Sequence, residues 1–193
     1  MKKKLMKLEI GGIFFIIILS IFMQNLYSLC NREAIGVIFG SVNDSIWEIL
    51  KTMLLPYALW GFLELLSLHL PLKRFAAVKV ISLYYLGVSY IILSLALSLL
   101  NLDDEFILCF ICAIFCICTS LFLSYRLMNS NRKLEDFFYP AFFMLMLFAA
   151  FFFSFTPFPP HIYIFEDRFT GLYGIIPKNL DTGAIILDTL YYV

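Results

Sequence analysis

The chain has 193 residues, of which 62% are hydrophobic, 18% aromatic and only 15% charged, and its mean hydropathy is +0.92. Soluble domains carry about a quarter charged residues and just under half apolar ones, so the composition excludes a soluble globular protein. The 14 Lys and Arg residues balance 14 Asp and Glu residues, and without a basic excess we expect no nucleic-acid partner. The expected partner is the lipid bilayer.

Five stretches are apolar over the roughly 20 residues that a helix needs to cross about 30 Å of hydrocarbon. We therefore predict an all-α membrane protein, a bundle of five transmembrane helices within residues 1–157. The predicted spans are 10–29, 46–70, 78–100, 106–125 and 137–156. Residues 158–193 are predicted to form a tail outside the membrane, with a short extended cap in which two short strands can pair.

The positive charges predict the orientation, because short cytoplasmic connections are enriched in Lys and Arg. An N-terminus in the cytoplasm places most of them on that side: Lys2, Lys3, Lys4, Lys7, Lys73, Arg74, Lys79, Arg126, Arg132 and Lys133. The opposite side receives Arg32, Arg168 and Lys178. No small-residue cleavage site follows the first apolar run, so we expect an uncleaved anchor. The prediction is a cytoplasmic N-terminus and an extracytoplasmic C-terminus.

The start of the second predicted span holds a cluster of polar residues. Ser45-x-x-Glu48 has the form of a capping box, in which the serine oxygen accepts from the Glu48 amide and the carboxylate reaches back to the Ser45 amide. Asp44, Glu48 and Lys51 are also spaced to share one helix face. They can bind a cation, a lipid headgroup or a substrate amine, or form an internal salt bridge. Trp47 is expected at the membrane interface.

Glu64 is the deepest acid of this span, and ionisable residues inside a membrane are functional candidates. It lies roughly 160° around a straight helix from Glu48, so we expect the two acids in different sites. Glu64 is predicted to face the bundle interior and pair with a hydroxyl or amide, or to reach toward the cytoplasmic surface. His69 and Lys73 are its candidate partners there.

The tail begins with three prolines between positions 157 and 160, which end the fifth span and force an extended exit. Apolar runs at 162–165 and 172–176 are predicted to be extended, with a turn between them. We expect the tail to fold back over the outer mouth of the bundle. The residues expected to meet there are His161, Glu166, Asp167, Arg168, Asn43, Asp44 and Glu48.

A divalent metal is one possible cofactor of this outer site, because His161, Glu48 and Asp167 together offer ligands that such an ion uses. The alternative is structural: His161 orders the proline-rich turn, and Asp167 pairs with Arg168 or with turn amides. The sequence leaves both interpretations open.

Two segments of the sequence resemble the signatures of a known protein family. Val42 to Lys51 (VNDSIWEILK) and Pro159 to Ile175 (PPHIYIFEDRFTGLYGI) resemble the two signatures of an uncharacterised family of small bacterial integral membrane proteins. The resemblance extends over essentially the whole chain in length and span layout. It implies a protein of the bacterial cytoplasmic membrane with no assigned activity. Ile49 and Tyr163 stand where the family pattern has His and Pro, and the first departure weakens a metal site that needs a second histidine.

Three functions follow from these residues. The first is a non-enzymatic protein that binds a small molecule, a lipid or an ion at an extracytoplasmic site formed by the start of the second span and the tail. The second is a transporter, or a transporter subunit, for a cation or small metabolite, with Asp44, Glu48 and Lys51 at the entrance and Glu64 deeper. Because five spans without an internal repeat are few for a transporter, it would need to form a homo-oligomer or join a larger membrane complex.

The third function is a metal-assisted enzyme that modifies lipids, with its metal on the three ligands named above. The sequence contains only two histidines, and it has neither a His-Glu-x-x-His helix nor a phosphate-binding glycine loop. Catalytic residues therefore stay unassigned.

Overall fold

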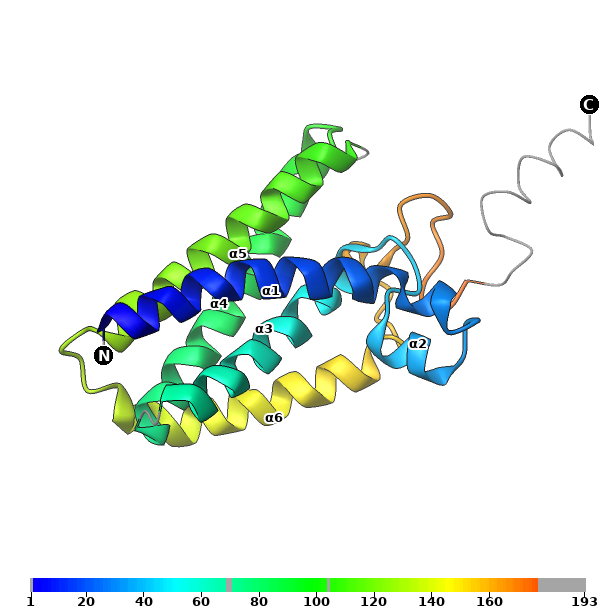
Figure 1. Ribbon diagram of the computed structural model, residues 1–193. Coiled ribbons are helices and arrows are strands. Elements are labelled where there is room, and N and C mark those ends of the chain that lie inside the picture. The colour runs from blue at the N-terminus through cyan, green and yellow to red at the C-terminus, as the bar shows by residue number, and fades with distance from the viewer. Residues whose placement is uncertain (1, 69–70, 104, 177–193) are drawn as a thin grey trace, which may run out of the picture. The chain divides into compact units, whose positions relative to one another are not determined.

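The computed structural model describes residues 2–68, 71–103 and 105–176, and it is helical (Figure 1). The elements in chain order are α1 (Lys2–Leu29), α2 (Ala34–Phe39), α3 (Ile46–Leu68), α4 (Leu72–Leu99), α5 (Phe106–Met128), the 3₁₀ helix η1 (Leu134–Phe137), α6 (Phe138–Ser154) and the 3₁₀ helix η2 (Tyr163–Phe165). No strand occurs in the described ranges, where one isolated antiparallel bridge joins Glu166 and Tyr173. The predicted all-α fold is confirmed.

Within the described ranges, five helices are long and apolar enough to cross a membrane, which confirms the predicted spans and indicates a multi-pass membrane protein. These are Lys2–Leu29, Ile46–Leu68, Leu72–Leu99, Phe106–Met128 and Leu134–Ser154. Two of them, α1 and α4, begin well before the apolar runs that predicted them. Hydropathy marks the part of a helix that lies in hydrocarbon, whereas charged residues such as Lys continue the helix beyond it at little cost.

The chain forms two compact units, and each is described by itself. Unit 1 contains the described residues between 2 and 21 and between 53 and 149, and unit 2 those between 22 and 52 and between 150 and 176. Helices α1, α3 and α6 contribute residues to both units. Residues 177–193 of the predicted tail lie outside the described residues.

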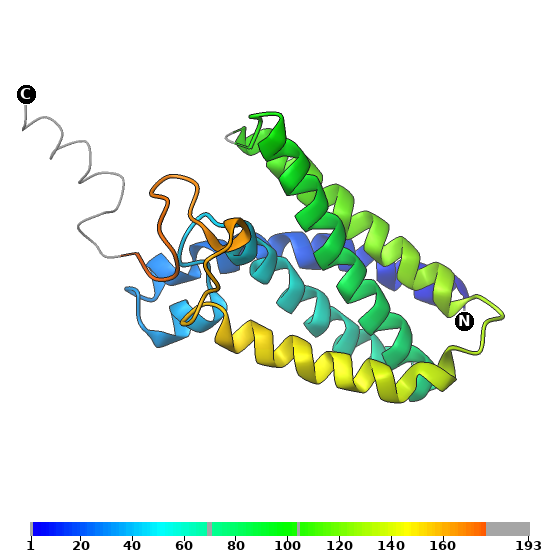
Figure 2. The same ribbon diagram turned by 180° about the vertical axis from the view of Figure 1, so that it is seen from behind.

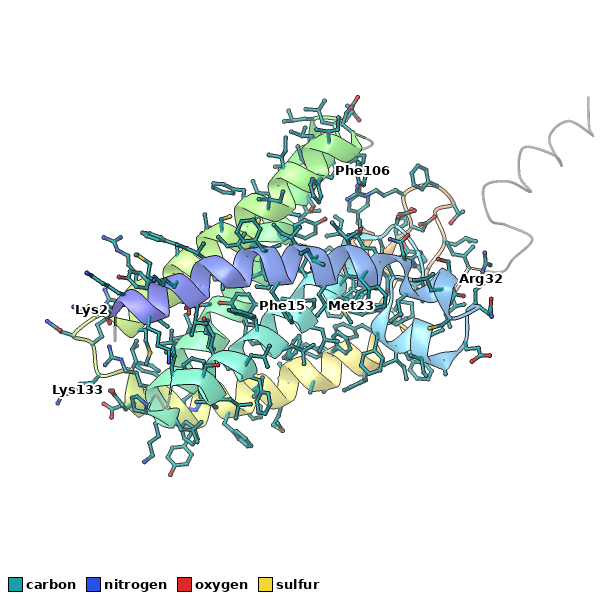
Figure 3. All side chains as sticks on the ribbon, in the orientation of Figure 1. Lys2, Phe15, Met23, Arg32, Phe106 and Lys133 are labelled. Carbon is teal, nitrogen blue, oxygen red and sulfur yellow. The ribbon has the colours of Figure 1, made fainter. Side chains whose placement is uncertain are left out.

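In unit 1, α4 and α5 lie side by side and antiparallel, as both views show (Figures 1 and 2). Lys2 and Lys133 lie at one end of this unit, and Phe106 lies at the other (Figure 3). Gly12 of α1 makes room for a side chain of α3, because a Cβ atom there would overlap the indole ring of Trp60. A small residue on a membrane helix lets a neighbouring helix pack closely against it, here through a large aromatic ring.

Unit 2 contains a short helix that the sequence analysis missed. After α1 the chain turns through Asn31 and Arg32, which have positive φ angles of 50° and 65°. Helix α2 then packs against the end of α1, and a Cβ atom on Gly36 would come within 2.8 Å of the Tyr27 Cα. Glycine is required there because the two backbones are in contact.

The tail of unit 2 is less extended than predicted. Tyr163–Phe165 forms a 3₁₀ helix instead of a strand, and the pairing with the second run is reduced to the single bridge. The predicted turn between the runs is present, because the Gly171 amide donates to the Asp167 carbonyl at 2.9 Å. The 3₁₀ helix occupies the first run, and Gly174, with a φ angle of +72°, interrupts extended backbone in the second.

Candidate functional site

The most completely hydrogen-bonded polar group of unit 2 is formed by Glu48, Lys51 and Thr156, which we call the Glu48 cluster. The Lys51 ammonium is 0% exposed and donates to Glu48 Oε2 at 2.7 Å, to Thr156 Oγ1 at 2.8 Å and to the Val37 carbonyl at 3.2 Å. Thr156 Oγ1 in turn donates to Glu48 Oε1 at 2.6 Å. Each ammonium proton therefore has an acceptor, and one acid balances one base.

The predicted capping box is half correct. The Glu48 amide donates to Ser45 Oγ at 3.2 Å, as expected. The reciprocal bond is wrong, because the Ser45 amide donates to Asn43 Oδ1 at 3.0 Å while Glu48 Oε2 accepts from the Val42 amide at 3.1 Å. The ammonium of Lys51 draws the carboxylate away from the helix start. Glu48 and Lys51 thus join the start of α3 to α2 and to the tail.

The two segments that carry the family resemblance are in direct contact. The Asp44 amide donates to Asp167 Oδ1 at 2.8 Å, across 123 positions of sequence, and Asn43 Nδ2 donates to the Gly174 carbonyl at 2.8 Å. Asp167 is buried, and its Oδ2 accepts from the amide and the hydroxyl of Thr170 at 2.8 and 2.7 Å. The Asp44 side chain, in contrast, is exposed.

Two carboxylates and one guanidinium are close together at this contact. The surrounding protein partly buries Asp44 and raises the pKa of its carboxyl above the ordinary value, and the carboxylate of Asp167 raises that pKa further. The guanidinium of Arg168 acts on the Asp44 pKa in the opposite direction. We call Asp44, Asp167 and Arg168 the Asp44 surface; its net charge is negative when both acids are ionised.

The two predicted aromatic and imidazole candidates lie in different surroundings. Trp47 is 8% exposed and packs against Phe155 and Phe165, with ring centroids 5.2 and 5.4 Å away. The folded tail covers the ring, and the position of Trp47 at the membrane interface stays a prediction. His161 is exposed and stacks on Tyr173 at 4.7 Å.

The predicted metal ligands are engaged in other contacts. Glu48 accepts from Lys51 and Thr156, and Asp167 accepts from two backbone amides and a hydroxyl. Within the described ranges no group of three or more His, Cys, Asp or Glu side chains is placed to hold a metal ion. The metal set of His161, Glu48 and Asp167 stays a prediction.

Unit 1 holds a second set of buried charges, Glu9, Glu64 and Lys79, which we call the Glu64 cluster. The Lys79 ammonium lies 3.0 and 3.1 Å from the two carboxylate oxygens of Glu9 and forms an ion pair with Glu64 Oε2. Ser124 Oγ donates to Glu9 Oε1 at 2.7 Å. The exposed fractions of Glu9, Glu64 and Lys79 are 5%, 1% and 9%. Glu64 faces protein, as predicted.

The ion-pair partner of Glu64 differs from the predicted candidates His69 and Lys73: it is Lys79 from α4. Lys73 is exposed, and His69 lies outside the described residues. Lys79 was predicted only as one of the cytoplasmic positive charges, and Glu9 was not among the predicted partners. Both lie seven residues after the first residue of their helices, Lys2 and Leu72, which is about 10 Å along each axis. Because the first and third spans enter the membrane from the same side, this equal depth was the signal that could have paired them.

The contacting segments and the span layout lie within one family match. Residues 1–175 match the model of a family of unknown function, DUF6512. The chain belongs to the DUF6512 family. The predicted membership in an uncharacterised family is thus confirmed, and the match includes the Glu48 cluster, the Asp44 surface and the Glu64 cluster. No curated protein and no solved structure matches the chain.

Proposed function

We propose that this DUF6512 protein binds a small cationic ligand on the Asp44 surface, on the extracytoplasmic side of the membrane. The observation that carries the proposal is the hydrogen bond from the Asp44 amide to Asp167, which holds two carboxylates together although they are far apart in sequence. An exposed acid beside a fixed, buried acid attracts a positive charge. Arg168 offsets only one of the two negative charges.

The Glu48 cluster supports this role by holding the start of α3 in place. Its ion pair is buried, and its hydrogen bonds reach α2 and the residue at which the tail begins, Thr156. A site whose supporting contacts are complete binds without first being ordered, which favours affinity. We therefore assign Glu48 and Lys51 a positioning role, and Asp44 and Asp167 the contact with the ligand.

Binding is tested on the purified full chain in detergent by thermal unfolding with Ca²⁺, Mg²⁺, Mn²⁺ or spermidine, and in vesicles with and without phosphatidylethanolamine. A cation at 100 times its Kd stabilises a folded protein by about 2.7 kcal/mol. We expect Asp44→Asn to abolish the stabilisation and Glu33→Gln, an exposed acid of the same unit, to retain it. The proposal fails if no cation or amine lipid stabilises the wild type. It also fails if the same ligand stabilises Asp44→Asn as much as the wild type.

The extracytoplasmic location rests on the charge asymmetry and has its own test. Phe158 lies in the tail and is exposed, so Phe158→Cys provides a label site on the segment that also carries Asp167 and Arg168. We expect a membrane-impermeant maleimide to label this variant in intact cells above the wild-type background of five cysteines. Labelling only after the membrane is opened would place the surface in the cytoplasm.

Transport of a cation is the second candidate, because Glu64 is buried among helices instead of facing lipid. Glu64→Gln would then change the flux of the transported cation into proteoliposomes, and the transporting form would be an oligomer. The metal-assisted enzyme has less support, since the carboxylate of Glu48 already accepts from Lys51 and Thr156. Stoichiometric metal in the purified protein that is lost in His161→Ala would favour it.

A further inference from the structure

We propose that the Glu64 cluster is a binding site for one exchangeable proton, and that Glu64 carries this proton. The inference goes beyond the proposed function, because it concerns unit 1 and requires no ligand on the Asp44 surface. It rests on the charges of the cluster, on its hydrogen bonds and on its position within the spanning helices.

The charges of the cluster do not balance. Two carboxylates, on α1 and α3, share one ammonium on α4. If all three groups are ionised, the cluster holds one net negative charge in a buried region of the spanning helices. An uncompensated charge in a low-dielectric region is strongly unfavourable, and an acid there takes up a proton instead. One proton makes the cluster neutral.

Among the described residues, the groups around the cluster provide no second positive charge. Lys79 Nζ lies over the rings of Tyr57 and Phe75, 5.6 and 5.8 Å from their centroids, and α5 contributes Ser124, a neutral hydroxyl. One turn before Glu64 on α3 is Trp60, whose indole Nε1 is buried and neutral. These groups can solvate a charge but cannot cancel it.

The hydrogen bonds distinguish the two acids. Glu9 receives the Lys79 ammonium on both oxygens and the Ser124 hydroxyl on one of them. Glu64 Oε1 is buried, and no described residue donates a hydrogen bond to it. The carboxylate with fewer donors is the poorer anion, so the proton resides on Glu64.

The cluster also lies near one end of unit 1, at a depth that protons can reach. Glu9 and Lys79 lie about 10 Å, and Glu64 about 6 Å, along their helices from the nearest helix end. That end carries Lys2 and Lys133 (Figure 3). A short chain of transient waters would connect Glu64 to the aqueous phase there, so the proton exchanges with the predicted cytoplasmic side.

Infrared spectroscopy of the full chain in vesicles tests the proposal without any assay of activity. We expect a carbonyl band of a protonated carboxylic acid to persist above about pH 5.5, where exposed carboxyl groups are ionised, and to disappear at higher pH. The band should be lost in Glu64→Gln and retained in the control Glu33→Gln. Lys79→Met leaves two acids without a base and should roughly double the band.

Two results would overturn the proposal: a wild type without this band, or a band in Lys79→Met no larger than in the wild type. A band that depends on Na⁺ at constant pH would exclude the proton as the ligand. Dicyclohexylcarbodiimide, which adds to protonated carboxyl groups in apolar surroundings, locates the proton in the unaltered chain. Mass spectrometry should find the adduct on Glu64, decreasing with pH, and an adduct on Glu9 would refute the assignment.

Discussion

Replacement of Thr156 by valine tests whether the Glu48 cluster holds unit 2 together. Valine keeps the shape of threonine and removes only the hydroxyl. That hydroxyl donates to Glu48 Oε1 at 2.6 Å and accepts from Lys51 Nζ at 2.8 Å. Both partners are charged and buried, so each loses a hydrogen bond that water cannot replace.

The expected loss of stability follows from these two bonds. A hydrogen bond to a charged group contributes about 1.5–3 kcal/mol, so Thr156→Val should lower the free energy of unfolding by about 3–6 kcal/mol. Thr156→Ser is the matched control, because it keeps the hydroxyl and loses one methyl group, which costs about 1 kcal/mol.

Unfolding in mixed micelles with increasing dodecyl sulfate, followed by tryptophan fluorescence, measures both variants. Trp47 lies in the same unit and packs against Phe155, the neighbour of Thr156, so its emission reports on this region. If Thr156→Val is no less stable than Thr156→Ser, the hydroxyl does not link the two charges and the account of the cluster is wrong.

Three further predictions use the same titration. Lys51→Met leaves a buried, unpaired Glu48 and should cost about 3–5 kcal/mol, whereas the double variant Lys51→Met/Glu48→Gln should be more stable than Lys51→Met alone; additive losses would contradict this. The pKa of Asp44 is raised in the folded chain, so the folded state binds the proton more tightly than the unfolded state. Wild-type stability relative to Asp44→Asn should be highest below pH 3.8, fall as the pH rises from there to the raised pKa, and stay constant above it; a difference that does not change with pH would contradict the assignment. Gly12→Ala should destabilise the chain by about 1–3 kcal/mol, because its Cβ overlaps the indole ring on α3. Gly11→Ala, whose Cβ meets the same ring at 3.8 Å, should be neutral or stabilising, and equal effects of the two would argue against the close approach.

The spans were predictable because hydropathy over 20 residues measures the same quantity that the bilayer selects. The helix ends were not predictable from hydropathy, and the error in the start of the third span hid the ion pairs of Lys79. Placing the start of the third span at 78 left Lys79 at the edge of the span, among the cytoplasmic charges, although α4 begins at Leu72 and Lys79 is buried. A hydropathy scale gives every Lys the same polar value, as if it were in water. It therefore does not include the stabilisation that Lys79 gains from Glu9 and Glu64 on neighbouring helices.

The contact between the two segments that carry the family resemblance was predictable in part. Asp44 and Asp167 were predicted to meet because the orientation places both on the same side of the membrane and because the tail is too apolar to extend into water. The structure joins them by a hydrogen bond. The partner of Lys51 could not be predicted in the same way. Thr156 is 105 positions away and carries no charge, so neither periodicity nor electrostatics distinguishes it from the other hydroxyls of the chain.

The two clusters of buried charge differ in one physical respect that separates structure from function. In the Glu48 cluster one acid meets one base and each ammonium proton has an acceptor, so nothing is left to bind. In the Glu64 cluster two acids meet one base, and Glu64 Oε1 has no donor in the described part of the chain. Buried polar groups that are fully paired fix a fold, whereas an unpaired one has a free energy that a proton or an ion can lower. Function in this chain is therefore to be sought at Glu64 and on the Asp44 surface, where charge is left over.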